Sequence, residues 1–375
     1  MGRKSFRDLL MYEETLFQDE RVFDLDYIPK DFNYRDSQLR EIAFCMRPAV
    51  KGGRPVNARI TGPPATGKTT AVKLMFDEIM GQTDKVACVH VNCQMHASKF
   101  SVFSQIHKKV MGHLPPETGV PFPKVYDAIF KKLLKENKSL VVALDDMNYL
   151  FYDRHVNDIL YQILRAHELY LGVKTAIIGV LSDVEFNYKL DIRVSSVYKP
   201  REIFFQPYSM EEVKAILKDR AEVGFYPGVI SEEVLAMVAN HAFERGDLRV
   251  GIELLRMSAL KAEAEASRHI ETKHVVDALS SSRLINLAHI LSTLSEEELK
   301  LMKMIAEAGR INSGKLYEVY KGKTKQSYTK FYRSLDKLET LRLVDTKFTG
   351  KGRKGRSREI IARYLRDEVN KALEK

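Results

Sequence analysis

The chain has 375 residues, 45% of them hydrophobic and three of them cysteine, which excludes a small disulfide scaffold and allows two or three domains. No apolar run approaches about 18 residues and residues 1–20 show no cleavable signal pattern, so we expect a soluble intracellular protein. The net charge of +10 is uneven: residues 290–375 carry 21 Lys and Arg against 12 Asp and Glu, and the rest carries 39 against 38, which predicts a polyanion partner for that end only.

The beginning of the chain gives weak signals. Residues 1–20 mix charges with scattered apolar side chains, and we expect a mobile arm or a lone helix. Residues 22–35 are rich in aromatic residues and proline and precede a helix expected over residues 36–46. The helix over residues 36–46 either closes over a ligand bound at the loop that follows or serves only as packing, and both interpretations stay open.

A phosphate-binding loop is predicted where Gly-Pro-Pro-Ala-Thr-Gly-Lys-Thr follows an apolar strand and precedes an apolar-periodic helix. The two glycines let backbone amides turn toward a polyphosphate, and the helix adds the positive end of its dipole. Lys68 would bind the outer phosphates, and the hydroxyl of Thr69 would bind a magnesium ion. A bland Gly/Pro turn is the alternative. The expected nucleotide-binding residues here are Gly62, Pro63, Pro64, Ala65, Thr66, Gly67, Lys68, Thr69 and Thr70.

The next strand is expected over residues 86–92 and contains a short cluster of metal-binding residue types. Cys88, His90 and Cys93 lie close together, but no second Cys/His pair has the spacing of a zinc site. We therefore interpret this cluster as core packing. The insertion that follows should contain a helix over residues 100–111, a proline-rich break over residues 114–121 and a second helix over residues 125–134.

The next strand is expected over residues 139–146, and two adjacent acids stand at its carboxyl end. A parallel nucleotide-binding sheet places acids at this carboxyl end beside its phosphate loop. We expect Asp145 to hold magnesium, through water, and Asp146 to act as the general base that polarises the attacking water. Because Asp146 is one methylene shorter than glutamate, we predict slow hydrolysis.

Two further polar residues are candidates for the same chemistry. A buried strand over residues 174–181 ends at Ser182, near where a sensor of the terminal phosphate is needed. Arg193 lies in the stretch 190–196, and either serves a neighbouring subunit's nucleotide in trans or is tied to nearby acids.

After a last short strand over residues 202–205 the pattern becomes helical throughout residues 210–281. Serine and threonine cap signals support helices over residues 210–222, 231–243, 248–267 and 271–281. Arg249, at the start of the third of these helices, could reach across a domain boundary to the phosphates.

The end of the chain has the pattern of a DNA-reading module. Three helices precede two strands joined by a basic, glycine-containing loop, which indicates a helix-turn-helix followed by a wing. The expected elements are helices over 296–308, 313–321 and 325–341, strands over 343–348 and 359–362, and the loop 349–358. The expected DNA-binding residues are Lys325, Gln326, Ser327, Tyr328, Lys330, Arg333, Lys351, Arg353, Lys354, Arg356 and Arg358.

In this order the motifs resemble those of one family, the archaeal origin-recognition initiators, which are AAA+ ATPases related to the eukaryotic origin recognition complex and its helicase-loading cofactor. The resemblance covers nearly the whole chain. It departs from the family's usual pattern at Ala65, Asp146 and Ser182, all of which bear on hydrolysis. It rests on residues 62–69 (Walker A), 144–146 (Walker B), 190–196 (arginine-finger box), 205–208, 246–249 (sensor 2) and the winged helix.

The resemblance implies an α/β P-loop AAA+ ATPase domain with a parallel sheet, a helical lid domain and a C-terminal winged-helix domain. Tyr208, from the 205–208 stretch, is added to the nucleotide-binding residues. The expected parts are an N-terminal arm, the base, the lid and the winged helix, over residues 1–20, 21–206, 207–285 and 286–375.

The resemblance also implies a function: an ATP-regulated replication initiator that binds double-stranded origin DNA through the winged helix and the insertion near residues 114–121. ATP or ADP with Mg²⁺ would be the cofactor, and a replicative helicase and paralogous initiator subunits would be partners in a cytoplasmic, nucleoid-associated location. A regulatory paralogue or a nucleotide-switched transcription regulator is the alternative. A clamp-loader-like motor is a further one, which the basic terminal module disfavours.

Overall fold

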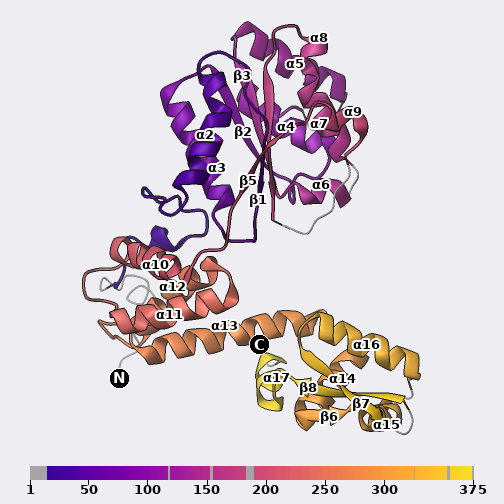
Figure 1. Ribbon diagram of the computed structural model, residues 1–375. Coiled ribbons are helices and arrows are strands. Elements are labelled where there is room, and N and C mark those ends of the chain that lie inside the picture. Colours follow the sequence, from indigo (N-terminus) through magenta and orange to yellow (C-terminus); the bar gives the residue numbers. More distant parts are fainter. Residues whose placement is uncertain are drawn as a thin grey trace. The chain divides into compact units, whose positions relative to one another are not determined.

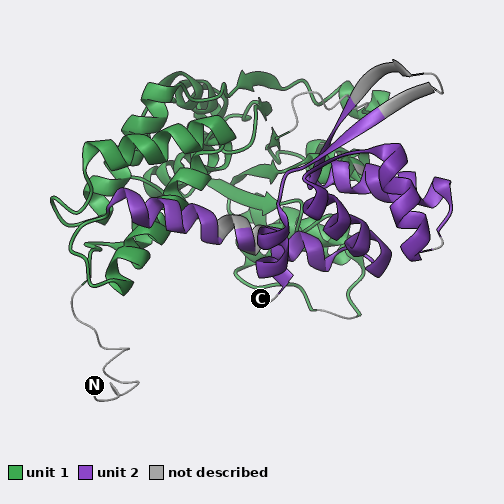
Figure 2. Cartoon of the chain, turned by 90° about the horizontal axis from the view of Figure 1, so that it is seen from below, with its two compact units in different colours: residues 1–270 green, residues 271–375 purple. Residues whose placement is uncertain are grey.

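The computed structural model describes residues 15–116, 119–152, 155–182, 190–324, 326–352 and 355–373. The chain forms two compact units, Met1–Ile270 and Glu271–Lys375 (Figure 2). Across the described ranges, no helix is both long and apolar enough to cross a membrane.

The first unit contains the predicted parallel sheet. Its strand order is β2-β3-β4-β1-β5, and every pair of neighbours runs parallel. The central strands β3 and β4 are buried along their whole length, as expected for a sheet covered on both faces. The strands are β1 (Ala58–Thr61), β2 (Val86–Asn92), β3 (Ser139–Asp145), β4 (Thr175–Leu181) and β5 (Arg201–Phe204).

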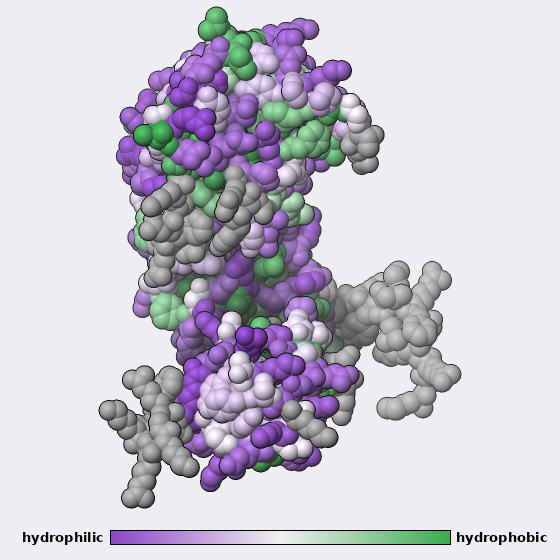
Figure 3. Space-filling view, turned by 90° about the vertical axis from the view of Figure 1, so that its right-hand side faces the viewer, coloured by the Kyte–Doolittle hydropathy of each residue, from purple (hydrophilic) through white to green (hydrophobic). Residues whose placement is uncertain are grey.

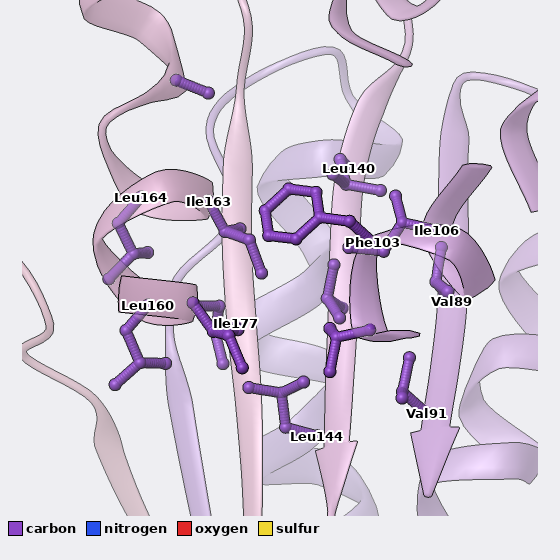
Figure 4. Close-up of a cluster of buried hydrophobic side chains, with 14 of the residues drawn as sticks. Val89, Val91, Phe103, Ile106, Leu140, Leu144, Leu160, Ile163, Leu164 and Ile177 are labelled. Atoms are coloured by element: carbon purple, nitrogen blue, oxygen red, sulfur yellow. The ribbon is translucent and has the colours of Figure 1, made fainter. Parts of the chain in front are cut away.

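Helices cover both faces of this sheet (Figure 1). Alternate residues of β3 point to opposite faces, so Val141 and Ala143 pack in one core and Val142 and Leu144 in the other. The first core includes α2 (Asp36–Val50) and α3 (Lys68–Gln82). The second includes α4 (Lys99–Met111), α5 (Phe122–Lys135) and α7 (Val156–Leu164), and Figure 4 shows side chains of α4 and α7 against three strands. Shorter helices are α6 (Asn148–Tyr152), α8 (Ala166–Leu169) and α9 (Ile192–Ser195).

Three helices after the sheet form the lid: α10 (Met210–Gly224), α11 (Glu232–Arg245) and α12 (Leu248–Ala264). The predicted serine caps are present, since Ser209 and Ser231 each accept a hydrogen bond from a backbone amide in the first turn.

The described part of the expected N-terminal arm, residues 15–20, packs on the lid. Phe17 and Phe23 are buried against Phe225, with ring centroids 5.4 and 4.6 Å away. The Leu16 amide donates to Glu263, and Arg220 donates to the Val22 carbonyl. The short helix η1 (Glu20–Phe23) lies in this segment, and residues 1–14 lie outside the described ranges.

The second unit contains the predicted winged helix. Its three strands form an antiparallel sheet in the order β6-β8-β7, and its core includes Leu316, Phe331, Leu335 and Ile360. The elements are α13 (Thr272–Ser292), α14 (Glu296–Ala308), β6 (Arg310–Asn312), α15 (Ser313–Thr324), α16 (Tyr328–Thr340), β7 (Val344–Gly352), β8 (Gly355–Ala362) and α17 (Arg366–Leu373).

Two expectations for this unit are wrong in extent. The helix expected to end at residue 281 continues as α13 to Ser292, across the boundary predicted at residue 285. The wing strands extend through most of the stretch 349–358 expected to be a loop, because β7 and β8 stay paired as far as Gly352 and Gly355. The sequence signals for β6 and α17 were missed.

The contact between the N-terminal segment and the lid gives a stability prediction. A methyl group at Gly224 would overlap the Phe23 ring, so Gly224→Ala should destabilise the protein by about 1–3 kcal/mol through overpacking. The control is Gly81→Ala in α3, where a methyl group meets nothing within 4 Å and should stabilise by about 0.5–1 kcal/mol. Thermal unfolding of both variants measures the difference, and equal effects would contradict the packing described.

Candidate functional site

The predicted phosphate loop connects β1 to α3, and its backbone requires its two glycines. Gly67 caps α3 in the left-handed region at φ 88°, and a methyl group there would lie 2.8 Å from the Phe32 ring. A methyl group at Gly62 would overlap the Phe205 carbonyl oxygen. Ala65, where a third glycine is usual, is also left-handed at φ 59°, a conformation that costs an L-residue about 1 kcal/mol. The methyl group is therefore accommodated with strain.

Lys68 is buried at the first position of α3. Its Nζ donates to the carbonyl oxygens of Gly62 and Pro63, at 2.8 and 2.6 Å. Burial lowers the pKa of Lys68 to about 8, although the charges of Asp145 and Asp146 act in the opposite direction. The ammonium group is held by backbone dipoles rather than an ion pair, so an incoming anion would be a better partner than its present ones.

Asp145 ends β3 and is brought to the phosphate loop, as predicted. Its Oδ2 accepts a hydrogen bond from Thr69 Oγ1 at 2.8 Å and lies 2.9 Å from Nε2 of His90. Burial acts to raise the pKa of Asp145, but the hydrogen bonds of His90 and Thr69 outweigh it and hold this pKa below its usual value. The carboxylate is therefore ionised and lies beside a threonine hydroxyl, so two oxygen atoms that can serve as ligands of a hard metal ion are close together.

His90 corrects the interpretation of the Cys/His cluster as core packing alone. Cys88 and Cys93 are buried and free, as expected, but His90 reaches Asp145. A polar residue near the carboxyl end of an otherwise apolar strand was the available signal for this contact.

The two residues assigned to hydrolysis are also brought together. Ser182 Oγ donates to Asp146 Oδ1 at 2.9 Å, from the end of β4 to the residue after β3. Asp146 has φ 51°, a left-handed conformation, at the turn between the end of β3 and the start of α6. Ser182, the predicted sensor of the terminal phosphate, and Asp146, the predicted base, thus contact one another.

Tyr208 is buried beside the phosphate loop, and sequence reasoning missed its partner. The guanidinium carbon of Arg35 lies 3.7 Å from the centre of the Tyr208 ring, and burial raises the pKa of the tyrosine. Arg35 has no exposed surface and donates hydrogen bonds to the carbonyl oxygens of Thr66 and Gln206. No sequence signal separates such an arginine from an exposed one.

Arg249 lies in the first turn of α12 and is half exposed. Its Nη2 donates to Asp247 Oδ2 at 2.7 Å and its Nε to Asp247 Oδ1 at 3.0 Å. Its charge also acts to lower the pKa of Lys68.

Arg193 on α9 is largely exposed. Its Nη2 lies 3.8 Å from Oδ2 of Asp191, a long distance for an ion pair. A solvent-facing guanidinium is compatible with action on a neighbouring subunit, and the weak ion pair is compatible with the other interpretation. Both stay open.

The predicted DNA-binding residues divide into free and engaged ones. Lys330 and Arg333 on α16 are exposed, as is Tyr328, which contacts Tyr332. The face of the second unit visible in Figure 3 is largely hydrophilic. Ser327 uses its hydroxyl to cap α16, and Gln326 is partly buried.

Arg358, also predicted to contact DNA, is engaged by acids in this structure. It pairs with Asp336 at 2.8 Å and with Glu339 at 3.9 Å. The remaining predicted contacts, Lys325, Arg353 and Lys354, lie outside the described residues, and only the backbone of Lys351 and Arg356 is described.

Comparison with known proteins was consistent across three kinds of evidence. The model of the Cdc6 AAA+ ATPase-type lid domain matches residues 214–280. ORC1-type DNA replication protein 2 of Methanothermobacter thermautotrophicus is 49% identical over 370 residues, which cover 98% of each chain. The protein of the same description from Methanosarcina acetivorans is 43% identical over 368 residues, covering 98% of this chain and 99% of its own.

Solved structures agree. The Aeropyrum pernix ORC1 protein in complex with DNA superposes with a TM-score of 0.75 at 26% identity, covering 96% of this chain and 97% of its own. The Aeropyrum pernix ORC2 protein, in ADPNP-ADP complexes, gives 0.63 at 26% identity, covering 96% and 98%. The resemblance inferred from the motifs is confirmed, and the chain belongs to the archaeal ORC1-type family of origin-recognition AAA+ proteins.

Proposed function

We propose that this protein is an ATP-regulated DNA replication initiator that binds double-stranded origin DNA and helps to recruit or load the replicative helicase. The observation that carries the proposal is the convergence of Lys68, Thr69 and Asp145 at one phosphate loop, in a chain that also presents free cations on a winged helix. The similar proteins support it, since the relatives are replication proteins and one similar structure is an ORC1 protein with DNA.

ATP or ADP is the proposed ligand of the loop. A similar solved structure is an ORC2 protein with ADPNP and ADP, which supports this choice. Thr69 and Asp145 would hold Mg²⁺, because a hydroxyl and an ionised carboxylate 2.8 Å apart are the hard oxygen donors that this ion prefers. The ion would neutralise phosphate charge, while Lys68 would exchange its carbonyl partners for the outer phosphates. Arg249 would approach the same phosphates from the lid.

Hydrolysis is proposed to be slow, so that the bound nucleotide acts as a switch. Asp146 is the base, and its carboxylate is engaged by Ser182 rather than free to orient a water. The hydrogen bond from Ser182 must break before Asp146 can activate a water, and the aspartate side chain is shorter than that of glutamate. Both features slow hydrolysis. A neighbouring subunit's Arg193 would add further charge stabilisation to this site.

Duplex DNA is proposed to bind along α16 and the wing. Lys330, Arg333 and Tyr328 would face DNA from α16, and the wing cations would add phosphate contacts. Because Asp336 and Glu339 already neutralise Arg358, we assign that arginine to holding the wing strand against α16.

The competing proposal is a transcription regulator that also binds a nucleotide and duplex DNA. Mapping of bound sites across the source genome separates the two. Sites concentrated at replication start points support the initiator, whereas sites scattered over promoters would contradict it.

Lys68→Met should weaken ATP and ADP binding by about a hundredfold, because a charge-assisted phosphate contact is worth about 3 kcal/mol. The variant without nucleotide should be at least as stable as the wild type, since burial of the ammonium disfavours its charged form in the folded state. Titration calorimetry gives the affinity. Lys73→Met, on the same helix, is the control and should bind normally; equal affinity of all three proteins would refute the assignment.

The double substitution Lys330→Ala with Arg333→Ala should weaken binding to duplexes of any sequence and reduce the slope of log K against log salt by about 2. Lys300→Ala with Lys303→Ala removes the same charge from exposed positions of α14 and should leave the slope unchanged. Fluorescence anisotropy at several salt concentrations measures both. Equal slopes for the two double variants would show that α16 does not lie on DNA.

A further inference from the structure

Arg35, the residue before α2, is an arginine with no exposed surface. Its Nε donates to the Thr66 carbonyl at 3.0 Å, its Nη2 to the Gln206 carbonyl at 2.8 Å, and its Nη1 to the Tyr34 carbonyl at 3.1 Å. Its guanidinium plane is further covered by Tyr208.

The charge of Arg35 is buried without a counterion. All three of its acceptors are neutral carbonyl groups, and within the described part of the chain no carboxylate pairs with it. A buried cation without an acid is expensive, and an apolar side chain of similar volume would fill the same space at lower cost. We therefore attribute the arginine at this position to the backbone segments that its hydrogen bonds connect, and not to a contribution to core stability.

Arg35 joins the phosphate loop to the linker between β5 and α10, the segment 205–209. Thr66 belongs to the loop and Gln206 to the linker. The two segments also touch directly at both loop glycines: a methyl group at Gly62 would overlap the Phe205 carbonyl, and one at Gly67 would lie 3.0 Å from the Tyr208 hydroxyl. A displacement of the loop therefore reaches the linker, which leads into the lid.

We propose that Arg35 is a positioning residue that fixes the phosphate loop against the linker into the lid, so that bound nucleotide orders both segments together. This inference rests on the proposed nucleotide binding. The guanidinium suits the task because its donors lie in one rigid plane and can serve carbonyl groups of separate segments at once, which an ammonium group cannot do in the same geometry.

Arg35→Lys separates the geometry from the charge, because lysine keeps the positive charge and most of the volume. In the full-length protein we expect ADP affinity to fall by about tenfold or more, and by a larger factor for Arg35→Met. Arg40→Met is the control, since Arg40 is exposed on α2 five residues further along, and it should bind as the wild type does. Circular dichroism at the titration temperature confirms that each protein is folded.

Hydrogen exchange at saturating Mg²⁺-ADP supplies a readout that general destabilisation would not produce. In the wild type, nucleotide should protect amides of both the loop 62–67 and the linker 205–209. In Arg35→Lys it should protect the loop and leave the linker at its nucleotide-free exchange rate. Linker protection in Arg35→Lys equal to that of the wild type would overturn the inference while leaving the nucleotide site intact. Absence of ADP binding by the wild type would instead overturn the proposed function, and this inference with it.

Discussion

The first unit depends on two buried cations that backbone carbonyl groups hold in place of acids. Lys68 donates to the carbonyls of Gly62 and Pro63, and Arg35 donates to that of Thr66, so both ends of the same loop are contacted by positive charge. Taking such charges out of water without an anion is unfavourable. The arrangement makes sense if Lys68 is one half of an ionic interaction whose other half is the polyphosphate that we propose, while Arg35 holds the loop in place.

The parallel sheet explains how residues far apart in the chain meet at this loop. The strand order β3-β4-β1 places three carboxyl ends side by side, and they lead to Asp145, Ser182 and Gly62. Open parallel sheets bind ligands at this edge for the same reason. The acids, the polar sensor and the phosphate loop therefore belong to one site because of topology, with no local signal linking them in the sequence.

What could be predicted from the sequence follows from how local the signals are. The strand at residues 86–92 and the loop at 62–69 were predicted because alternation, glycine and the Lys-Thr pair are read within ten residues. Arg35, His90 and the packing of Phe17 on the lid were missed because each depends on a partner more than 30 residues away. The ion pair between Arg358 and Asp336 was missed for a similar reason, since it joins a wing strand to α16.

Calorimetric unfolding of the full-length chain with and without Mg²⁺-ADP tests the central claim most directly. The account predicts that ADP raises the unfolding temperature of residues 1–270, by the equivalent of about 2.7 kcal/mol when free ADP is a hundredfold above its Kd, and leaves the transition of residues 271–375 in place. An unfolding profile unchanged by millimolar Mg²⁺-ADP would show that the loop held by these two buried cations does not bind the nucleotide.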